Sequence, residues 1–175
     1  MVDPSADFTA ARRRGDRPEV DWPLVRHSEL FGAVIEEALT RGTSVRFRAE
    51  GISMYPTIRD GEAITVAPVA SADVVNGDVL LCRHGTRVLA HRVVGVSICG
   101  GARVFELRGD AKAACDPPVA SDAVVGKVIG VNRNGRVITL SGRAARLRYY
   151  VRAAVSAVAA GVRGRSFGVS SRPVS

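Results

Sequence analysis

The chain has 175 residues, an ordinary length for one domain with short appendages, and such a domain buries a core without disulfide or metal staples. Its composition, 46% hydrophobic and 24% charged residues, is that of a globular protein and excludes a collagen-like, fibrous or largely disordered chain. The net charge is +8, but an arginine excess beside abundant Ala, Val and Gly can reflect codon composition, so we expect a solvated basic surface rather than a nucleic-acid partner.

The cysteines and the apolar runs indicate the compartment. The three cysteines are odd in number and form no C-x-x-C pair: Cys82, Cys99 and Cys115. This argues against a disulfide framework and a zinc site, and it fits a reducing compartment. The best apolar run, residues 153–162, is shorter than the roughly 20 residues of a spanning helix, and no apolar stretch follows the N-terminal arginines. We expect a cytoplasmic protein without metal or cofactor.

The N-terminal part of the chain predicts an arm and one helix. Residues 1–22 are polar and charged, which predicts a flexible arm. Within residues 23–43, apolar side chains recur at steps of three and four: Leu30, Phe31, Val34, Ile35, Ala38 and Leu39. This spacing predicts an amphipathic helix with Ser28 as its N-cap and Gly42 as its C-terminal stop.

Residues 44–141 change to the two-residue period of strands. Val45 and Phe47 alternate with arginines, and further β-rich runs are separated by turn residues such as Asn134-Gly135. These runs cover residues 64–66, 79–82, 87–96, 104–107, 124–131 and 136–140. Many short strands at close spacing predict a mainly β domain, built as a coiled antiparallel sheet or partly open barrel.

The C-terminal part predicts a second helix. In residues 142–163 one helical stripe carries apolar side chains: Leu147, Val151, Ala154, Val155 and Val158. A helix that docks on the domain is the simpler interpretation, and its arginine-rich flank leaves contact with a membrane surface open. The Gly/Ser/Arg-rich residues 164–175 predict a disordered tail.

The most informative stretch is GISMYPTIRDG, residues 51–61, directly after a predicted strand. Gly51 permits a tight turn and Pro56 cannot continue a central strand, so Ser53 stands at a shaped strand exit. Such a place suits an acyl-transfer nucleophile whose oxyanion is held by main-chain N–H groups. Taken alone, a turn serine that bonds its own backbone is the plainer interpretation.

Two later segments supply the partners that a nucleophilic serine needs. His91 lies within an apolar β run, and Asp110 and Asp116 lie in a turn that follows another predicted strand. Imidazole, with an ordinary pKa of about 6.5, can accept a proton near neutrality, and a carboxylate can fix its tautomer. A lone strand histidine is more often structural, and the spacing alone does not decide between the two.

Taken in order, these segments resemble the boxes of the signal peptidase I superfamily, which also contains the self-cleaving LexA-like repressors. Gly51–Gly61 resembles the nucleophile box, G-x-S-M-x-P-T-I-x-x-G. Asp78–Val94 resembles the box that runs from a G-D-V strand start to the base and R-V-V. Gly109–Asp116, followed by V-G-K-V at 125–128, resembles the G-D box. The resemblance covers about residues 45–131 and implies the fold and the serine endopeptidase activity of that superfamily.

The residue at the base position indicates the subclass. Bacterial leader peptidases and LexA-like proteins have a lysine there, whereas His91 resembles the endoplasmic-reticulum and archaeal type, which uses Ser, His and Asp. The resemblance implies Ser53 as nucleophile, His91 as general base and Asp116 as the orienting carboxylate. Asp110 stays open as a structural acid or alternative third member. A Ser–Lys dyad with Lys112 or Lys127 also stays open.

Two features depart from the signal peptidases. Gly51 stands where they carry a serine whose hydroxyl helps to hold the oxyanion, so backbone N–H groups, notably that of Ser53, would do this alone. Loss of such a donor costs on the order of 10²–10³ in rate, which predicts slow turnover. The membrane span that usually precedes the nucleophile box is also missing, so we expect a cytosolic precursor or recruitment by a membrane-bound partner.

The resemblance further implies an extended peptide or protein precursor as substrate, added as a strand beside the barrel edge, with small side chains near the cut. The residues expected to contact it flank the nucleophile and the base: Gly51, Ile52, Met54, Leu89 and Ala90. The oligomeric state stays undetermined.

Two other functions stay open. A self-cleaving LexA-like regulator needs a DNA-binding module, and residues 1–44 hold one clear helix, too little for a helix-turn-helix with its own core. A non-catalytic β-rich module can keep the fold and bind a partner through its arginines. Its aromatic residues, 5% of the chain, do not interleave with the basic ones as a nucleic-acid stacking platform requires.

Overall fold

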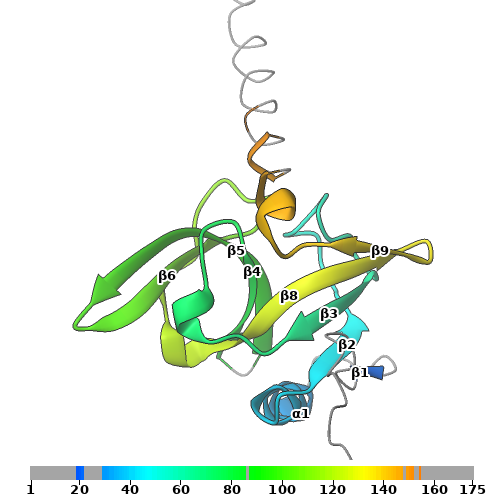
Figure 1. Cartoon of the computed structure of the whole chain (residues 1–175), viewed down its shortest axis with the longest axis horizontal. Coiled ribbons are helices and arrows are strands. Elements are labelled where there is room, and N and C mark those ends of the chain that lie inside the picture. Colours follow the sequence, from blue (N-terminus) through cyan, green and yellow to red (C-terminus); the bar gives the residue numbers. More distant parts are fainter. Residues whose placement is uncertain (1–18, 22–28, 86, 148, 152–153, 155–175) are drawn as a thin grey trace, which may run out of the picture.

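The computed structural model of the protein describes residues 19–21, 29–85, 87–147, 149–151 and 154, and all structural statements below concern these residues (Figure 1). Strands predominate. In chain order the elements are β1 (Glu19–Asp21), α1 (Glu29–Thr40), β2 (Ser44–Arg48), β3 (Ala63–Ala67), the 3₁₀ turn η1 (Ser71–Asp73), β4 (Val79–His84), β5 (Arg87–Cys99), β6 (Ala102–Arg108), β7 (Val119–Ala120), the 3₁₀ turn η2 (Ser121–Ala123), β8 (Val124–Arg133) and β9 (Arg136–Thr139).

The strands form one open, coiled sheet. Its order is β1-β2-β3-β8-β4-β5-β6-β7, with β9 paired to β8 beside this path. All neighbours are antiparallel except β1 and β2, which run parallel. This confirms the mainly β, partly open antiparallel architecture that the sequence predicts.

Two long strands make the sheet coil. β5 pairs with β4 over its first half and with β6 over its second half, and β8 pairs with β4 near its start and with β9 near its end. A bulge at Val93/Gly95 gives β5 an extra residue opposite β6, and β8 has an extra residue opposite β3 and another opposite β4. Because bulges bend a strand and increase its twist, one strand serves two parts of the sheet that face different directions (Figure 1).

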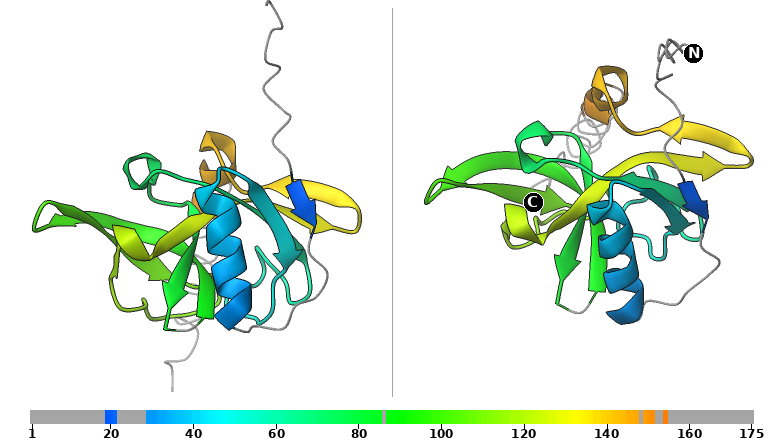
Figure 2. Two further views of the ribbon diagram at one scale, coloured as in Figure 1. Left: turned by 90° about the horizontal axis from the view of Figure 1, so that it is seen from below. Right: turned by 60° about the horizontal axis from the view of Figure 1, so that its bottom comes forward.

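The larger core lies between α1 and the sheet. Phe31, Ile35 and Leu39, spaced four residues apart, point into this core, and α1 packs against β2, β8 and the start of β5 (Figure 2). A Cβ on Gly126 of β8 would lie 3.0 Å from a Leu39 methyl carbon and 2.8 Å from Val66. Glycine at that position therefore allows the helix and β3 to approach β8 closely.

A smaller core fills the other side of the sheet. Its buried members are the residue after η1 and residues of β4, β5 and β6: Val74, Leu80, Cys82, Val93, Phe105 and Leu107. On β4, Leu80 and Cys82 face this core while Val79 and Leu81 face the larger one. Because successive strand residues point to opposite faces, β4 is buried on both sides and reads in the sequence as a continuous apolar run.

Of the N-terminal predictions, the helix is confirmed and the flexible arm is not. The predicted helix is present as α1, and Gly42 ends it with φ +82° while the N–H groups of Gly42 and Thr43 bond the carbonyls of Leu39 and Ala38. Residues 19–21, within the segment predicted to be a flexible arm, instead form β1, so that prediction is wrong for these three residues. Residues 1–18 and Ser28, the predicted N-cap, lie outside the description.

The remaining predictions concern the hairpins and the C-terminus. Every predicted strand is present, whereas β1 and β7 were not predicted. Asn134 and Gly135 both have positive φ and close the β8–β9 hairpin as expected. A helix begins at residue 143 and includes residues 143–147, 149–151 and 154, while the predicted tail, 164–175, lies outside the described residues. None of the helices in the described ranges is long and apolar enough to cross a membrane.

Candidate active site

Ser53 lies in the loop that joins β2 to β3, and this loop is tied at both ends. At its base the N–H of Gly61 donates to the carbonyl of Ala49 at 2.8 Å, and the N–H of Gly51 donates to Asp60 Oδ1 at 2.7 Å. The loop is also anchored from within, because Met54 and Ile58 are buried in the larger core. The serine therefore stands on a fixed turn.

His91 is the partner of the serine hydroxyl. It lies in β5 opposite Leu80 of β4, and its side chain has no solvent exposure. Its Nε2 lies 3.0 Å from Ser53 Oγ, although the two residues are 38 positions apart in the chain. A strand in the middle of the sheet thus holds the imidazole against the loop that carries Ser53.

Asp116 completes the chain of side chains. The loop after β6 returns toward the sheet, where the N–H of Asp116 donates to the carbonyl of Leu107 at 2.8 Å. The Asp116 carboxylate contacts His91 Nδ1, and its other oxygen accepts from Lys112 Nζ at 3.3 Å. A carboxylate at Nδ1 holds the proton on that nitrogen and leaves the lone pair of Nε2 for the serine hydroxyl.

The electrostatics keep Asp116 ionised. Partial burial by itself raises the pKa of this carboxyl, but the hydrogen bond and charge of His91, together with those of Lys112, outweigh burial and leave the pKa below its ordinary value. An ionised carboxylate can stabilise an imidazolium without taking its proton. Asp116 is therefore suited to orient the base and balance its charge.

The two loops that carry Ser53 and Asp116 meet at Gly109. The carbonyl of Ser53 accepts the N–H of Ala111 at 2.8 Å. A Cβ on Gly109 would lie 2.6 Å from that carbonyl oxygen and 3.1 Å from His91 Nε2. No side chain fits there, so the glycine is needed for the loops to approach.

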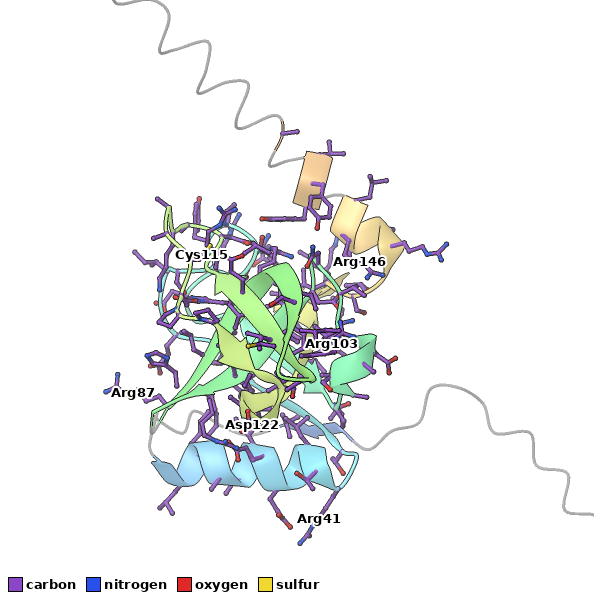
Figure 3. The ribbon with its side chains drawn as sticks, turned by 90° about the vertical axis from the view of Figure 1, so that its left-hand side faces the viewer. Arg41, Arg87, Arg103, Cys115, Asp122 and Arg146 are labelled. Carbon is purple, nitrogen blue, oxygen red and sulfur yellow. The ribbon has the colours of Figure 1, made fainter. Side chains whose placement is uncertain are left out.

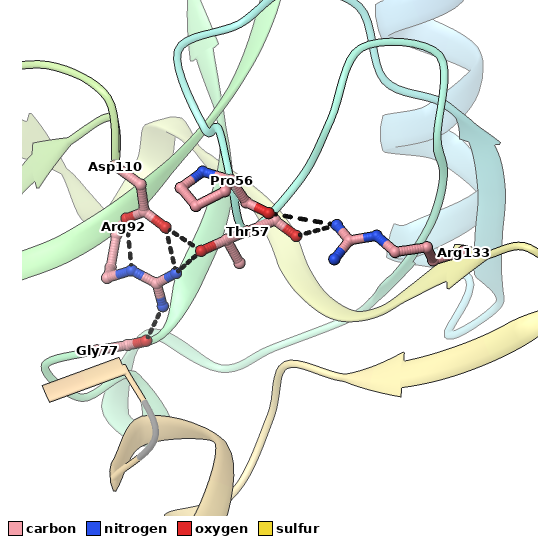
Figure 4. A network of polar contacts seen from close by, with 6 residues as sticks. All are labelled: Pro56, Thr57, Gly77, Arg92, Asp110 and Arg133. Carbon is pink, nitrogen blue, oxygen red and sulfur yellow. Dashed lines mark hydrogen bonds and ion pairs between the residues drawn. The ribbon is translucent and has the colours of Figure 1, made fainter. Parts of the chain in front are cut away.

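Asp110 has a different partner from Asp116. Both of its oxygens are bound by the guanidinium of Arg92, at 2.7 and 2.6 Å, and Thr57 Oγ1 donates to it at 2.5 Å (Figure 4). Arg92 also donates to the carbonyl of Gly77 at 2.8 Å. The structure therefore brings Asp116, and not Asp110, to the imidazole, while Asp110 attaches its loop to β5 and to the β2–β3 loop that carries Ser53.

Sequence analysis did not single out Arg92 and Thr57, which form this anchor. Arg92 is 3% exposed, and an arginine is rarely so buried without an acidic partner. An arginine within the apolar run of β5 was therefore a usable signal, because a buried cation requires a carboxylate nearby. Thr57 carried no such signal.

The two lysines are engaged elsewhere. Lys127 Nζ bonds the buried carboxylate of Asp78 at 2.9 Å, and Lys112 bonds Asp116 from the solvent side. The nitrogen at hydrogen-bond distance from Ser53 Oγ belongs to His91. The contacts around the serine thus form a Ser–His pair and not the Ser–Lys dyad that the sequence left open.

A groove with a volume of about 510 Å³ opens in front of the serine. Four of the five predicted substrate contacts line it, namely Gly51, Met54, Leu89 and Ala90, together with Ser53 itself. Ile52 is not among the lining residues, and its side chain is 76% exposed. The floor is apolar and is supplied by the larger core, including Phe47, Ile64 and Leu81.

One wall of the groove is a strand edge. β5 pairs with β4 along Arg87–Arg92, but its pairing with β6 begins only at Arg92. Residues 87–90 therefore have a strand neighbour on one side only within the described part of the chain. The backbone N–H of Ser53 likewise has no acceptor among the described residues, so it is free to donate to an oxygen that arrives in the groove.

In comparisons with known proteins, no protein-family model and no curated protein matches this chain. Among the described residues, no group of three or more His, Cys, Asp or Glu side chains is arranged to hold a metal ion. The assignment of a function therefore depends on the geometry of the site.

Proposed function

We propose that the protein is a serine endopeptidase of the signal-peptidase type, with a Ser-His-Asp catalytic set, that processes a peptide or protein precursor. The observation that carries the proposal is the ordered series of contacts from the Asp116 carboxylate to His91 Nδ1 and from His91 Nε2 to Ser53 Oγ, at the mouth of an apolar groove. A structural histidine has no need of a serine at one nitrogen and a carboxylate at the other. The LexA-like fold that the sequence motifs imply belongs to the same proposal.

Acylation follows from the positions of these groups. Ser53 Oγ attacks the carbonyl carbon of the substrate while its proton passes to His91 Nε2, and Asp116 stabilises the imidazolium that forms. The backbone N–H of Ser53 donates to the oxyanion of the tetrahedral intermediate. The intermediate then collapses, the C–N bond breaks, and the leaving amine takes the proton from Nε2.

Deacylation repeats these steps with water. A water molecule attacks the acyl-enzyme ester and gives its proton to the now neutral His91, which returns it to Ser53 Oγ as the new carboxyl product leaves. With Gly51 in place of a donor side chain, backbone N–H groups alone hold the oxyanion. We therefore expect turnover slower by on the order of 10²–10³ than in a site that has the additional donor.

The groove suggests how a substrate binds. An extended peptide can pair with the free edge of β5 at residues 87–90, which places alternate side chains over the apolar floor. Main-chain hydrogen bonds then supply affinity for many sequences, and the floor selects the side chains near the cut. By the resemblance, those side chains are small.

The test is cleavage of a mixed peptide library, followed by mass spectrometry, with wild type and three variants. Ser53→Ala and His91→Ala should each lower the cleavage rate by on the order of 10⁴–10⁶, because each removes one member of a unit that acts together. Ser97→Ala is the matched control, since this serine lies in the same strand as His91, is exposed and lies outside the groove.

The pH profile is the second readout. Cleavage should fall as pH decreases, because a protonated base cannot take the serine proton. Because the pKa of Asp116 lies below its ordinary value, we do not expect protonation of this carboxylate to cause the fall in cleavage. A plateau that continues to about pH 4 would exclude an imidazole base.

Three results would contradict the proposal. Equal cleavage by wild type and Ser53→Ala would assign the activity to a contaminant. Spontaneous shortening of the purified chain at alkaline pH, without cleavage of added peptides, would favour the self-cleaving regulator. No serine-dependent cleavage, combined with salt-sensitive binding of oligonucleotides, would favour the non-catalytic binding module.

A further inference from the structure

The charge of the chain is unevenly distributed along its length. All 17 acidic residues precede residue 123, whereas ten of the 25 Lys and Arg residues follow it. The last 53 residues thus carry ten cationic side chains and no acidic one. A block of one sign attracts a surface of the opposite sign, which here is anionic.

The helix that begins at residue 143 lies within this block and has an apolar outer face. Leu147, Tyr150 and Val151 are 64%, 47% and 55% exposed, and Ala154 is exposed as well. These four residues follow the spacing i, i+3, i+4, i+7, so they form one continuous stripe on the helix. Three large side chains are exposed on one helical face. The ring of Tyr150 also meets that of Tyr149, with the ring centroids 5.3 Å apart, but its outer part stays exposed, and such an exposed face indicates a binding surface.

The opposite face of this helix holds it to the domain. The ring of Tyr149 stacks on the guanidinium of Arg92, and the distance from the guanidinium carbon to the ring centroid is 4.0 Å. The side chain of Arg146 lies over Gly77, where a Cβ would come within 3.1 Å of it. Docking through Tyr149 turns the stripe away from the sheet. Figure 3 shows that this attachment, marked by Arg146, is at the end of the molecule opposite Arg41 of α1.

Basic residues border the stripe. Arg143 is exposed and lies one turn before Leu147 on the same face, and Arg146 lies beside it. Aliphatic side chains and a tyrosine between arginines match the boundary of a bilayer, where apolar groups enter the acyl region, the phenol stays at the headgroups and guanidinium groups pair with phosphates. A nucleic acid would use the arginines but would leave the aliphatic stripe in water.

We infer that the helix beginning at residue 143 binds in the plane of an anionic lipid surface, with Leu147, Tyr150 and Val151 toward the acyl chains and the neighbouring arginines at the phosphate groups. The inference goes beyond the proposed peptidase function and does not depend on it. The contact between Tyr149 and Arg92 adds a consequence, since Arg92 follows His91 in β5 and holds Asp110. The helix therefore attaches the membrane surface to the strand that carries the general base.

The experiment is flotation of the full-length protein with vesicles of phosphatidylglycerol mixed with phosphatidylcholine, and with vesicles of phosphatidylcholine alone. Wild type should float with the anionic vesicles, and less as salt is raised. The double variant Leu147→Glu/Val151→Glu should bind at least ten-fold more weakly, since each change removes a large apolar group from the interface. Arg143→Gln should weaken binding about five-fold, as expected for one basic residue at an anionic surface.

The control places the same change of charge elsewhere. Ile98 and Val137 are 76% and 72% exposed on strands β5 and β9, so Ile98→Glu/Val137→Glu adds two acidic groups without touching the stripe. The lower net charge of this variant weakens its attraction to the anionic vesicles. Apart from that screened effect of charge, its binding should stay within about two-fold of wild type. Ser53→Ala should float like wild type, which separates this inference from the peptidase proposal.

Several results would overturn the inference. Equal flotation with both kinds of vesicle would remove the anionic requirement. Flotation of the stripe variant at the wild-type level would exclude the stripe. Wild-type protein that binds an oligonucleotide in preference to anionic vesicles would assign the basic block to nucleic acid. A dimer that the stripe variant dissociates, without vesicle binding by wild type, would make the stripe an interface between copies.

Discussion

Two aspartates six residues apart have opposite surroundings, and these decide their roles. Asp116 shares its oxygens between a histidine and a half-exposed lysine, so it can respond when the imidazole gains a proton. Asp110 is 6% exposed and is held by a bidentate arginine that is itself buried. A bidentate buried pair is rigid, which suits a residue that positions a loop rather than one that takes part in proton transfer.

Asp116→Asn and Asp110→Asn should therefore separate activity from stability. In Asp116→Asn the new side-chain amide would donate to His91 Nδ1 and favour the tautomer with a proton on Nε2, so the rate should fall by about 10⁴ with little change in melting temperature. Asp110→Asn leaves the buried Arg92 charge unpaired and should cost about 3–5 kcal/mol of unfolding free energy. Cleavage kinetics and thermal unfolding of both variants check this.

For Asp110→Asn, the pH dependence of the remaining activity should keep the wild-type shape, because Asp110 does not contact the imidazole. The reverse result, a stable but inactive Asp110 variant with an unfolded Asp116 variant, would exchange the two roles.

At the scale of elements, the two faces of β5 hold different parts of the site. His91 points toward Ser53 and Asp116, and the next residue, Arg92, points toward Asp110 and Tyr149, because successive strand residues alternate. One strand thus sets the positions of the imidazole, of the loop that carries Asp110 and Asp116, and of the C-terminal helix. The turn at Gly109 brings that loop against the loop that carries Ser53.

Gly109→Ala should therefore impair catalysis directly. Its Cβ would meet the Ser53 carbonyl oxygen, and both loops would have to shift by several tenths of an ångström. A misplacement approaching 1 Å costs about 10² in rate, so kcat should fall by at least ten-fold. Gly32→Ala is the control, since a Cβ there meets nothing closer than 3.8 Å. Equal activity of Gly109→Ala and Gly32→Ala would show that the loops need not be this close.

At the scale of the molecule, an ion pair joins the end of β8 to the loop that carries Ser53. Arg133, the last residue of β8, donates to Glu62 at 2.8 Å and to the carbonyl of Thr57 at 3.1 Å (Figure 4 shows the latter contact). The hydrogen bond from Arg133 lowers the pKa of Glu62 below its ordinary value of 4.5. Packing of the β8–β9 hairpin is thereby coupled to the loop that carries Ser53.

This pair predicts how the stability of the whole protein depends on pH. Because the pKa of Glu62 is lower in the folded state, its contribution is complete above the unfolded value of about 4.5 and is lost as pH falls through the folded value. Glu62→Gln should lower the unfolding free energy by about 1 kcal/mol at neutral pH, and the difference from wild type should vanish in acid. Denaturant unfolding across pH measures it.

The matched control is Glu37→Gln, which breaks the exposed pair of Glu37 with Arg41 on α1. It should change stability by at most about 0.5 kcal/mol. A Glu62→Gln difference that stayed constant down to low pH would show that charge has no part in the contact.

The sequence by itself determined the strands and the candidate residues, because both depend on local patterns. Alternating Val45 and Phe47, the apolar run of β4 and the Asn134-Gly135 turn each record the burial or backbone angles of their own segment. Strands of two or three residues, such as β1 and β7, are too short to show an alternating pattern, so the sequence did not predict them.

Only the tertiary structure decided which carboxylate meets His91. Asp110 and Asp116 lie in one turn, and the choice depends on Arg92, which binds the first, and on Gly109, which has room for no side chain against the Ser53 carbonyl. It also decided that Leu147 and its neighbours face outward, because the Tyr149 ring stacks on an arginine 57 residues earlier in the chain. Contacts between distant segments arise when the chain packs, so no local pattern records them.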